Sequence, residues 1–166
     1  SGKIRQLGVE YNSSFLLLPY KPGNRLFRKI QWKTSYTYAR YKYRHYASGE
    51  KNYSGNSVAG IPRHVLINSF HFDFPKGIYC FIQHNFTDKI PLNDANTVFA
   101  DAYHLLNANI GIEFPSKKYY PSKIYLMFDN ILNEKYSLGN DLNAVGGRYF
   151  NAAPTFNFQF GIRWNL

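Results

Sequence analysis

Strict alternation of apolar and polar residues is the feature of this sequence that most limits its fold. In the last twelve residues, from Thr155 to Leu166, every even position from Phe156 is large and apolar, and every odd position is polar or glycine. Alternate side chains of a β-strand point to opposite faces, so this segment predicts a strand with one apolar and one polar face. Soluble strands are usually about 5–6 residues long, whereas a tilted membrane-spanning strand needs about 9–11. The pattern therefore favours a strand that crosses a membrane.

Six further segments show the same period with more irregularity. In the first of them Val9 and Tyr11 alternate with Glu10 and Asn12, and the turn signal Pro75-Lys76-Gly77 joins two others into a hairpin. The segments are residues 3–18, 26–44, 62–74, 78–90, 100–114 and 122–132. Together with 155–166 they predict seven strands.

The predicted connections alternate in length. Short Pro-containing stretches follow Leu18, Phe74 and Phe114, whereas longer polar stretches lie near 45–61, 88–98 and 133–154. Short turns on one side and longer loops on the other are typical of an outer-membrane barrel. We therefore predict an all-β, antiparallel up-and-down meander of about seven long strands, part of a large transmembrane β-barrel. Bacterial single-chain barrels have an even number of strands, so an odd number predicts that earlier strands are missing from this chain.

Composition and motifs exclude several other classes of protein. The chain has 166 residues, of which 19% are aromatic, and this argues against disorder. Leu16-Leu17-Leu18, among the longest aliphatic runs, is far shorter than a membrane-spanning helix. The single cysteine, Cys80, excludes an internal disulfide framework, and no nucleotide-binding or catalytic motif is present. We expect no enzymatic activity, no metal site and no cofactor.

Positive charge is concentrated in the first part of the chain. Residues 1–63 contain 12 Lys and Arg against Glu10 and Glu50, whereas residues 64–166 contain 8 basic and 8 acidic residues. The stretch from Lys33 to Arg44 interleaves tyrosines with cations, a composition that could bind single-stranded nucleic acid. It equally fits an aromatic girdle followed by cations at anionic lipid headgroups. Because the other segments have lipid-compatible faces, we favour outer-membrane lipid and lipopolysaccharide as partners and expect no nucleic acid.

The end of the chain contains a candidate assembly signal. Gln159, Gly161, Trp164 and Leu166 follow the order polar-x-Gly-x-x-apolar-x-apolar, which resembles the signal that barrel-assembly machinery recognises in a last strand. Leu166 departs from the usual terminal aromatic residue. The alternative is an ordinary amphipathic strand that happens to end the chain.

Four motifs, in order, resemble the C-terminal barrel of TonB-dependent outer-membrane receptors. They are Gly55-Asn56-Ser57-Val58-Ala59-Gly60-Ile61-Pro62-Arg63-His64, Asn93-Asp94-Ala95-Asn96-Thr97, Asp129-Asn130-Ile131-Leu132-Asn133-Glu134-Lys135-Tyr136 and Gly146-Gly147-Arg148-Tyr149-Phe150-Asn151-Ala152-Ala153-Pro154. The resemblance implies a barrel of about 22 strands in the bacterial outer membrane, with an N-terminal plug domain that contacts TonB. It also implies active uptake, most often of ferric siderophores. Residues 1–166 would then be the C-terminal barrel segment, without the plug and the earlier strands.

Candidate solute contacts lie in the predicted extracellular loops. Arg44, His45, Tyr46, Arg148 and Tyr149 combine cations and phenols, which suit an anionic, oxygen-rich ferric chelate. Asn130 and Asn133 are expected to cap turns, and Gly146-Gly147 is expected to form a tight loop. Two alternatives to the receptor remain open. One is a complete eight-stranded outer-membrane barrel with an eighth strand within 44–61 or 133–154, and the other is a soluble lipocalin-like barrel with its apolar face inward.

Overall fold

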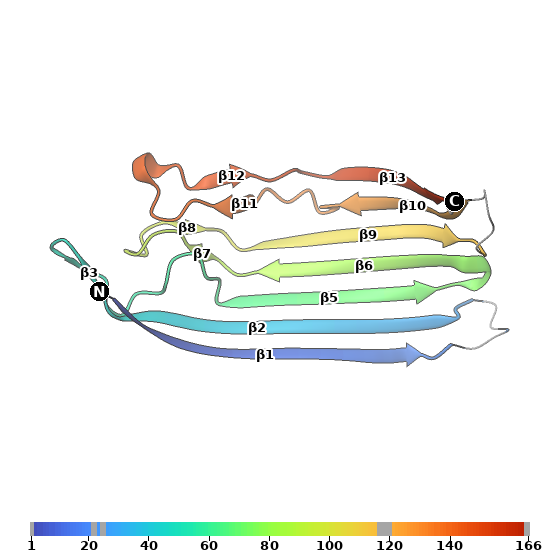
Figure 1. Ribbon diagram of the computed structural model, residues 1–166, viewed down its shortest axis with the longest axis horizontal. Coiled ribbons are helices and arrows are strands. Elements are labelled where there is room, and N and C mark those ends of the chain that lie inside the picture. The colour runs from blue at the N-terminus through green and yellow to red at the C-terminus, as the bar shows by residue number, and fades with distance from the viewer. Residues whose placement is uncertain (1, 21–22, 24–25, 116–120, 165–166) are drawn as a thin grey trace.

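Seven long antiparallel strands form one curved sheet in the computed structural model, in which residues 2–20, 23, 26–115 and 121–164 are described (Figure 1). The strands are neighbours in chain order, so each pairs with the next as in a meander. They are β1 (Lys3–Leu18), β2 (Lys29–His45), β5 (His64–Asp73), β6 (Ile78–Thr87), β9 (Tyr103–Glu113), β10 (Pro121–Asp129) and β13 (Asn157–Trp164). The prediction of an all-β meander of seven long strands is confirmed.

Short two-stranded sheets extend the connections at one end of the main sheet. They pair β3 (Ala47–Ser48) with β4 (Lys51–Asn52), β7 (Ile90–Pro91) with β8 (Phe99–Ala100), and β11 (Ser137–Asn140) with β12 (Phe150–Ala152). Two single turns of 3₁₀ helix, η1 (Pro75–Gly77) and η2 (Val145–Gly147), complete the elements. The stretches 44–61 and 133–154 therefore contain short strands, but within the described residues these strands do not join the main sheet.

Asn130 ends β10 earlier than the alternation predicted. The predicted strand ran to Leu132, whereas β10 stops at Asp129 because Asn130 adopts a left-handed conformation with φ of 50°. Asn130 is only 4% exposed, its side chain bonds to Glu134 and Pro154, and its backbone N–H donates to Asn107 Oδ1. Asn133 has φ of 53° and accepts a bond from the N–H of Phe156. The predicted turn-capping roles of both asparagines are confirmed.

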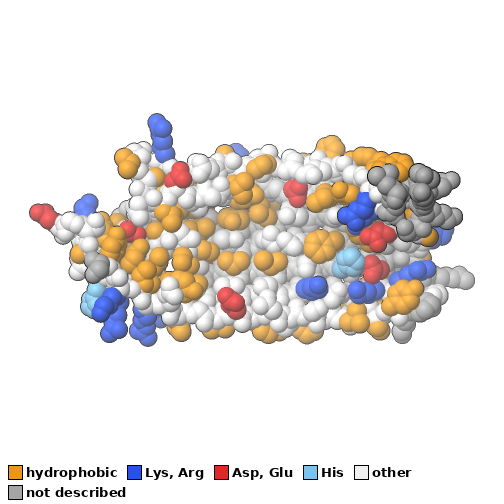
Figure 2. Space-filling model, viewed as in Figure 1, with side chains coloured by type: hydrophobic (Ala, Val, Ile, Leu, Met, Phe, Trp, Pro, Cys, Tyr) orange, Lys and Arg blue, Asp and Glu red, His pale blue; other side chains and the backbone are white. Residues whose placement is uncertain are grey.

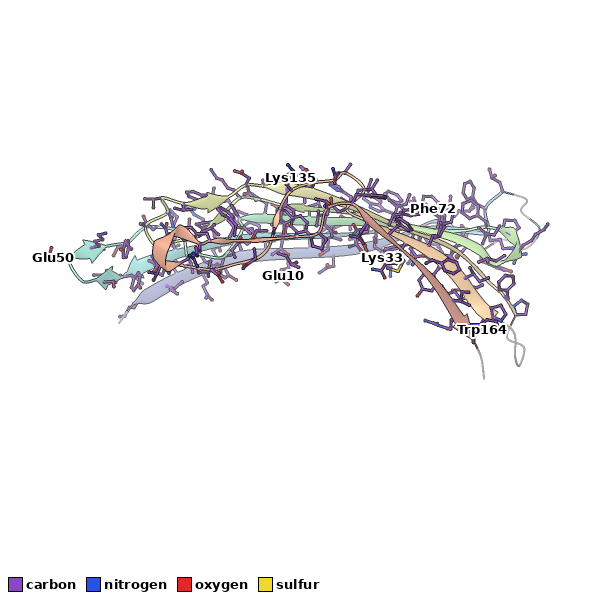
Figure 3. The ribbon with its side chains drawn as sticks, turned by 90° about the horizontal axis from the view of Figure 1, so that it is seen from above. Glu10, Lys33, Glu50, Phe72, Lys135 and Trp164 are labelled. Carbon is purple, nitrogen blue, oxygen red and sulfur yellow. The ribbon has the colours of Figure 1, made fainter. Side chains whose placement is uncertain are left out.

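The two faces of the sheet differ in polarity. Phe72 lies on the convex side in Figure 3, whereas Glu10 and Lys33 lie on the concave side. Pairing register places Phe15, Trp32, Phe70, Ile82, Ala108, Phe128 and Phe158 in one row across all seven strands of the convex face. The concave face shows separate hydrophobic patches among polar and charged side chains (Figure 2). The apolar face therefore points away from the hollow of the sheet.

This apolar convex face is not covered by any part of the chain that the structure describes. Among those residues, only Ala59, Tyr79, Leu92 and Ala100 are buried hydrophobic side chains. Large side chains along β13, such as Phe158 at 65% and Phe160 at 61%, remain exposed. An exposed apolar face of this extent marks a surface that contacts a membrane or another apolar partner.

Aromatic side chains concentrate at both ends of the convex face. At the short-turn end, Phe27 lies 5.0 Å from Phe74 between ring centroids. At the other end, Tyr36 is bonded to His64 at 2.8 Å, and Phe86 lies 4.8 Å from His104. The eleven residues from His64 to Phe74 span about 33 Å along the strand, or about 25 Å of height at a roughly 40° tilt. This matches the apolar band of an outer-membrane barrel, which is bounded by two aromatic girdles.

Tyrosines lie over glycines on the concave face. Tyr79 pairs with Gly111, and a Cβ at Gly111 would lie 2.7 Å from the Tyr79 hydroxyl oxygen. Tyr125 pairs with Gly161, where a Cβ would overlap the Tyr125 ring. Both glycines thus leave the space that a cross-strand aromatic ring occupies. Gly161 has this packing role whether or not it also belongs to an assembly signal.

Candidate functional site at the long-loop end

Three of the long connections are bonded together at one end of the sheet. The first includes residues 55–62, the second residues 88–98 and the third residues 141–143. Gly60 N–H donates to the Pro91 carbonyl at 2.8 Å, and Asn143 N–H donates to the Leu92 carbonyl at 2.9 Å. Leu92, at 0% exposed, is the most deeply buried side chain that the structure describes. We refer to these three segments as the loop cluster.

Asp94 is the central residue of the loop cluster. Its carboxylate accepts hydrogen bonds from the hydroxyls of Tyr43 at 2.6 Å and Tyr46 at 3.2 Å. Its carbonyl accepts a bond from the Asn56 side chain, and its N–H donates to Asn143 Oδ1. A single residue thus connects β2, the loop after β2 and two further loops.

Asp94 also changes the acidity of both tyrosines. Tyr43 lies on the extension of β2 beyond the apolar band, where partial burial and the hydrogen bond to Asp94 raise its pKa from 10.0 to about 12. The negative charge of Asp94 raises the pKa of Tyr46, which is in the loop after β2. Both phenols are therefore protonated donors at physiological pH, and their contacts stabilise the loops.

A second, neighbouring polar link joins the first two loops. Ser57 N–H donates to Asn96 Oδ1 at 2.8 Å, and the Asn96 amide donates back to the Ser57 carbonyl at 2.9 Å. Asn96 has a left-handed φ of 55°, which asparagine tolerates better than most residues. The segments with Gly55 and Asn93, identified separately in the sequence, thus meet in one structure.

The predicted solute contacts do not form one cluster. Arg44 and His45 are exposed at the end of β2, where a register shift between Lys3 and Ile4 leaves Arg44 without a strand partner. Tyr46 donates a hydrogen bond to Asp94, and its ring lies 4.6 Å from the Tyr43 ring between centroids, in a tilted arrangement. Within the described chain, no hydrogen bond, ion pair or ring contact joins this group to the other two predicted contacts.

The other predicted contacts lie between η2 and β12. Arg148 is exposed and follows η2, and the Tyr149 carbonyl accepts a bond from the Asp141 N–H at 3.0 Å. Gly146 and Gly147 have φ of 75° and 76°, as the tight-loop prediction required. Arg44 and Arg148 are thus exposed cations at the same end of the sheet, one at the end of β2 and the other in the loop before β12.

Two structural features of this end were not among the predicted site residues. One is Asp94 with Tyr43, although the motif Asn93–Thr97 and the Tyr-rich β2 were both singled out in the sequence. The other is a cavity of about 500 Å³ between β8 and β12. It is lined by Lys135 and Asn140 together with Tyr103 and Tyr136, whose tilted rings lie 4.9 Å apart between centroids. Alternation alone contains no signal for contacts between loops.

The candidate assembly residues lie in or just beyond β13. Gln159 pairs with Met127, Gly161 lies beneath Tyr125, and Trp164 is 56% exposed at the short-turn end. Leu166 lies outside the described residues. Recognition of these four residues by assembly machinery stays a prediction.

The described residues contain no cluster of three or more metal-ligating His, Cys, Asp or Glu side chains. Histidines approach one another in one pair, where His84 Nε2 lies 3.0 Å from His104 Nδ1 on the convex face. No helix in the described parts of the chain is long and apolar enough to cross a membrane.

The sheet is a curved, amphipathic meander whose apolar convex face lies between two aromatic belts. This is the architecture of the wall of a transmembrane β-barrel.

Solved structures that share this fold include two receptors and a transporter. The ferric yersiniabactin uptake receptor FyuA from Yersinia pestis superposes with a TM-score of 0.70 at 18% identity, covering 97% of this chain and 23% of FyuA. The siderophore receptor PiuA from Acinetobacter baumannii gives a TM-score of 0.74 at 14% identity, over 97% of this chain and 22% of PiuA. The unliganded ferric citrate transporter FecA gives 0.75 at 18% identity, over 96% of this chain and 24% of FecA.

The fold is that of a barrel portion of a TonB-dependent receptor, as the motifs predicted. The chain spans about a quarter of the length of each of these receptors. No protein-family model matches the sequence. The convex apolar face also argues against the lipocalin-like alternative, in which that face would line the interior.

Proposed function

We propose that this chain forms the C-terminal barrel wall and part of the extracellular mouth of an outer-membrane receptor for active, TonB-coupled uptake of a ferric siderophore. The observation that carries the proposal is the seven-stranded amphipathic meander, which superposes over nearly its whole length on receptors for ferric chelates. The receptor would also contain a plug domain, the remaining strands and a TonB-contacting segment. The polar concave face, with Glu10 and Lys33, suits contact with a plug.

The size and location of the intact protein provide the first test. Outer membranes of the source organism are probed with an antibody to this chain, in boiled and unboiled samples. A barrel of roughly 22 strands predicts a band of roughly 60 kDa or more that migrates differently after boiling. A band near the chain's own mass of 19.3 kDa would contradict the receptor and favour a complete small barrel.

Uptake itself is tested with radiolabelled iron. Iron-starved cells with and without the gene receive ferric siderophores of different chemical classes, and cell-associated radioactivity is measured. We expect gene-dependent uptake of at least one ferric chelate, abolished by a protonophore or by loss of TonB. Gene-dependent uptake that continues without TonB would contradict the coupling mechanism.

Solute contact by the exposed cations is a further prediction. Arg44, His45, Tyr46, Arg148 and Tyr149 are proposed as contacts, and the two arginines suit a negatively charged chelate best. Arg44→Ala and Arg148→Ala should each weaken siderophore binding about 10-fold, because each removes a charge-assisted hydrogen bond of about 1.5 kcal/mol.

Lys51→Ala is the matched control for these two variants. Lys51 is an exposed cation on β4 at the same end of the sheet, and it is not a proposed contact. Binding is measured on purified receptor by quenching of intrinsic fluorescence during siderophore titration. If Lys51→Ala weakens binding as much as Arg148→Ala does, general charge attraction rather than specific contact explains the effect.

A further inference from the structure

A row of polar side chains interrupts the apolar convex face. Phe72 lies on this face and Lys33 on the concave face in Figure 3, so alternation along the strands places Asn68 and Thr34 on the convex side. The pairing register aligns one polar residue from each of the neighbouring strands β1, β2, β5 and β6 (Figure 1), namely Ser13, Thr34, Asn68 and His84. We refer to these four residues as the polar stripe.

The polar stripe lies inside the apolar band and not at its edge. The adjacent row on the short-turn side is apolar and consists of Phe15, Trp32, Phe70 and Ile82. The adjacent row on the long-loop side consists of Tyr11, Tyr36, Leu66 and Phe86. Asn68 follows His64, where the band begins, by about 13 Å along the strand, or about 10 Å of height at a tilt of about 40°. On β9 the row continues with the apolar Leu106, so the stripe is limited to four strands.

Hydrogen bonds within the described chain satisfy only part of the polar stripe. Asn68 Oδ1 accepts a bond from Trp32 Nε1 at 3.2 Å, and His84 Nε2 lies 3.0 Å from His104 Nδ1. Among the described residues, no hydrogen bond reaches the two hydroxyls of the stripe or the amide nitrogen of Asn68. The four side chains are half-buried, so their polar groups are accessible from outside the sheet. Polar groups at membrane depth are costly to leave unpaired, and they associate membrane-spanning segments through hydrogen bonds.

A second copy of the same barrel is the partner that this chemistry fits. A two-fold axis along the membrane normal holds each residue at the same depth as its counterpart in the other copy. Hydroxyl, amide and neutral imidazole groups each contain a donor and an acceptor, so the stripe can bond to an identical stripe without like-charge repulsion. Lipid acyl chains offer no donor or acceptor at this depth. The plug and the remaining strands of the proposed receptor would not cover the convex outside of the barrel.

The size of the surface is sufficient for a specific contact between two copies. Four strands spaced about 4.8 Å apart are roughly 19 Å wide, and the apolar band is about 25 Å tall. Contact over this surface would bury roughly 480 Å² on each copy, or roughly 1,000 Å² in total, the lower end of the range for specific interfaces. We propose that the convex surface of β1, β2, β5 and β6, centred on Thr34 and Asn68, is a dimer interface within the membrane. This inference rests on the barrel placement in the proposed function, and not on the transported solute.

The proposal is tested on the complete receptor that contains this chain. The receptor carries one fluorophore per chain and is reconstituted in phosphatidylcholine vesicles, where single-molecule photobleaching counts the copies in each particle. We expect wild type to form dimers whose fraction rises with the protein-to-lipid ratio. The triple variant Ser13→Ala, Thr34→Val and Asn68→Leu should raise the dissociation constant of the dimer on the order of 30-fold, since each hydrogen bond within the membrane contributes about a factor of three.

A control triple variant removes polar groups from the concave face of the same strands. Thr37→Val, Ser69→Ala and Gln83→Leu lie on the face that does not contact the second copy, and they should leave the dissociation constant at the wild-type value. A wild-type receptor that is monomeric at every protein-to-lipid ratio would overturn the proposal. Equal losses in both triple variants, or dimers of the stripe variant as stable as those of wild type, would also overturn it.

Cross-linking in outer membranes tests the contact with single substitutions. In a cysteine-free background that includes Cys80→Ser, a short bismaleimide should join two receptors that carry Asn68→Cys. Phe158→Cys, which is exposed on the convex face of β13 outside the stripe, is the control and should stay monomeric. Equal cross-linking at both positions would indicate random collision and would overturn the proposal.

Thr34→Val separates a role in the dimer from a role in folding. The Thr34 hydroxyl makes no hydrogen bond within the described chain, and valine has nearly the same shape. The substitution should therefore raise the dissociation constant of the dimer about three-fold and leave the urea midpoint of the monomeric receptor unchanged. A lower urea midpoint with an unchanged dissociation constant would assign Thr34 to folding and contradict the interface.

The outcomes for this inference and for the proposed function are distinguishable. A heat-modifiable receptor of roughly 60 kDa that takes up iron but is monomeric in vesicles would overturn the dimer alone. A receptor that forms the stripe-dependent dimer but takes up no ferric chelate would contradict the proposed solute alone. The stripe variant should take up iron at the wild-type rate per receptor, because none of its residues is a proposed solute contact.

Discussion

Gly161 and Tyr125 illustrate how single residues fix the pairing of neighbouring strands. The Tyr125 ring occupies the space that a side chain at 161 would need, and the two residues are direct cross-strand partners in β10 and β13. The same arrangement joins Tyr79 to Gly111 in β6 and β9. Any larger residue at these glycines must displace a ring that covers the adjacent strand.

Gly161→Val is therefore expected to destabilise the barrel by about 1–3 kcal/mol, the usual cost of overpacking. The measurement is the urea concentration at which the heat-modifiable band of the intact receptor is lost. When Tyr125→Ala is combined with Gly161→Val, most of the destabilisation caused by Gly161→Val should disappear. The valine side chain then no longer overlaps a tyrosine ring. Equal penalties in the presence and absence of the Tyr125 ring would show that Gly161 acts by another route, such as recognition during assembly.

At the long-loop end, Asp94 connects three parts of the chain through its hydrogen bonds to two tyrosines. Tyr43 belongs to β2, Tyr46 to the following loop and Asp94 to the loop between β7 and β8. Deprotonation of either phenol beside the Asp94 carboxylate would place two negative charges together. The loop cluster therefore has a titratable connection to the barrel wall.

The pH dependence of this connection follows from the raised pKa of Tyr43. Its folded pKa of about 12 lies above the usual value of 10.0, so the stabilisation is fully present below pH 10 and is lost as pH rises towards 12. We expect protease cleavage within residues 88–98 to increase over this interval. Asp94→Asn should lower the pKa of Tyr43, as measured by tyrosinate absorbance. An unchanged titration in Asp94→Asn would contradict the assigned cause, and Asp88→Asn is the control.

At the scale of the whole molecule, the two faces of the sheet meet different surroundings. Ile82 and Gln83 are consecutive residues of β6, yet Ile82 lies in the convex apolar row and Gln83 pairs with Ser69 and Asn107 on the polar face. In a barrel wall, Ile82 would face lipid and Gln83 would face the polar side of the sheet. A charged side chain should therefore destabilise the barrel more at position 82 than at position 83.

Ile82→Lys should destabilise the barrel by about 2–4 kcal/mol, the cost of a lysine near the bilayer midplane. Gln83→Lys should cost less than about 1 kcal/mol, because its ammonium group stays on the polar side. Both effects are measured as urea midpoints of the receptor in lipid vesicles. Similar penalties for both substitutions would contradict the assignment of the convex face to lipid.

Much of this architecture could be predicted from alternation alone. Period-two patterns located all seven long strands, because one-sided burial in lipid leaves a direct mark on the sequence. The end of β10 was wrong by a few residues, since Ile131 and Leu132 continue the apolar composition while Asn130 turns the backbone. The contacts of Asp94 with Tyr43 and Asn143 join residues up to 51 positions apart, and no local pattern encodes such distances.

The loop cluster has a consequence for how immune recognition of this protein would work. Its outward surface is assembled from three stretches of chain that are separated in sequence but bonded to one another through Gly60, Leu92 and Asn143. An antibody raised against the native surface would recognise a discontinuous epitope, and its binding would be lost when the chain is denatured. A synthetic peptide of residues 88–98 alone lacks the partners that shape this segment, so antisera against it would bind the folded protein poorly. Vaccine antigens based on this region would need the folded barrel as their carrier.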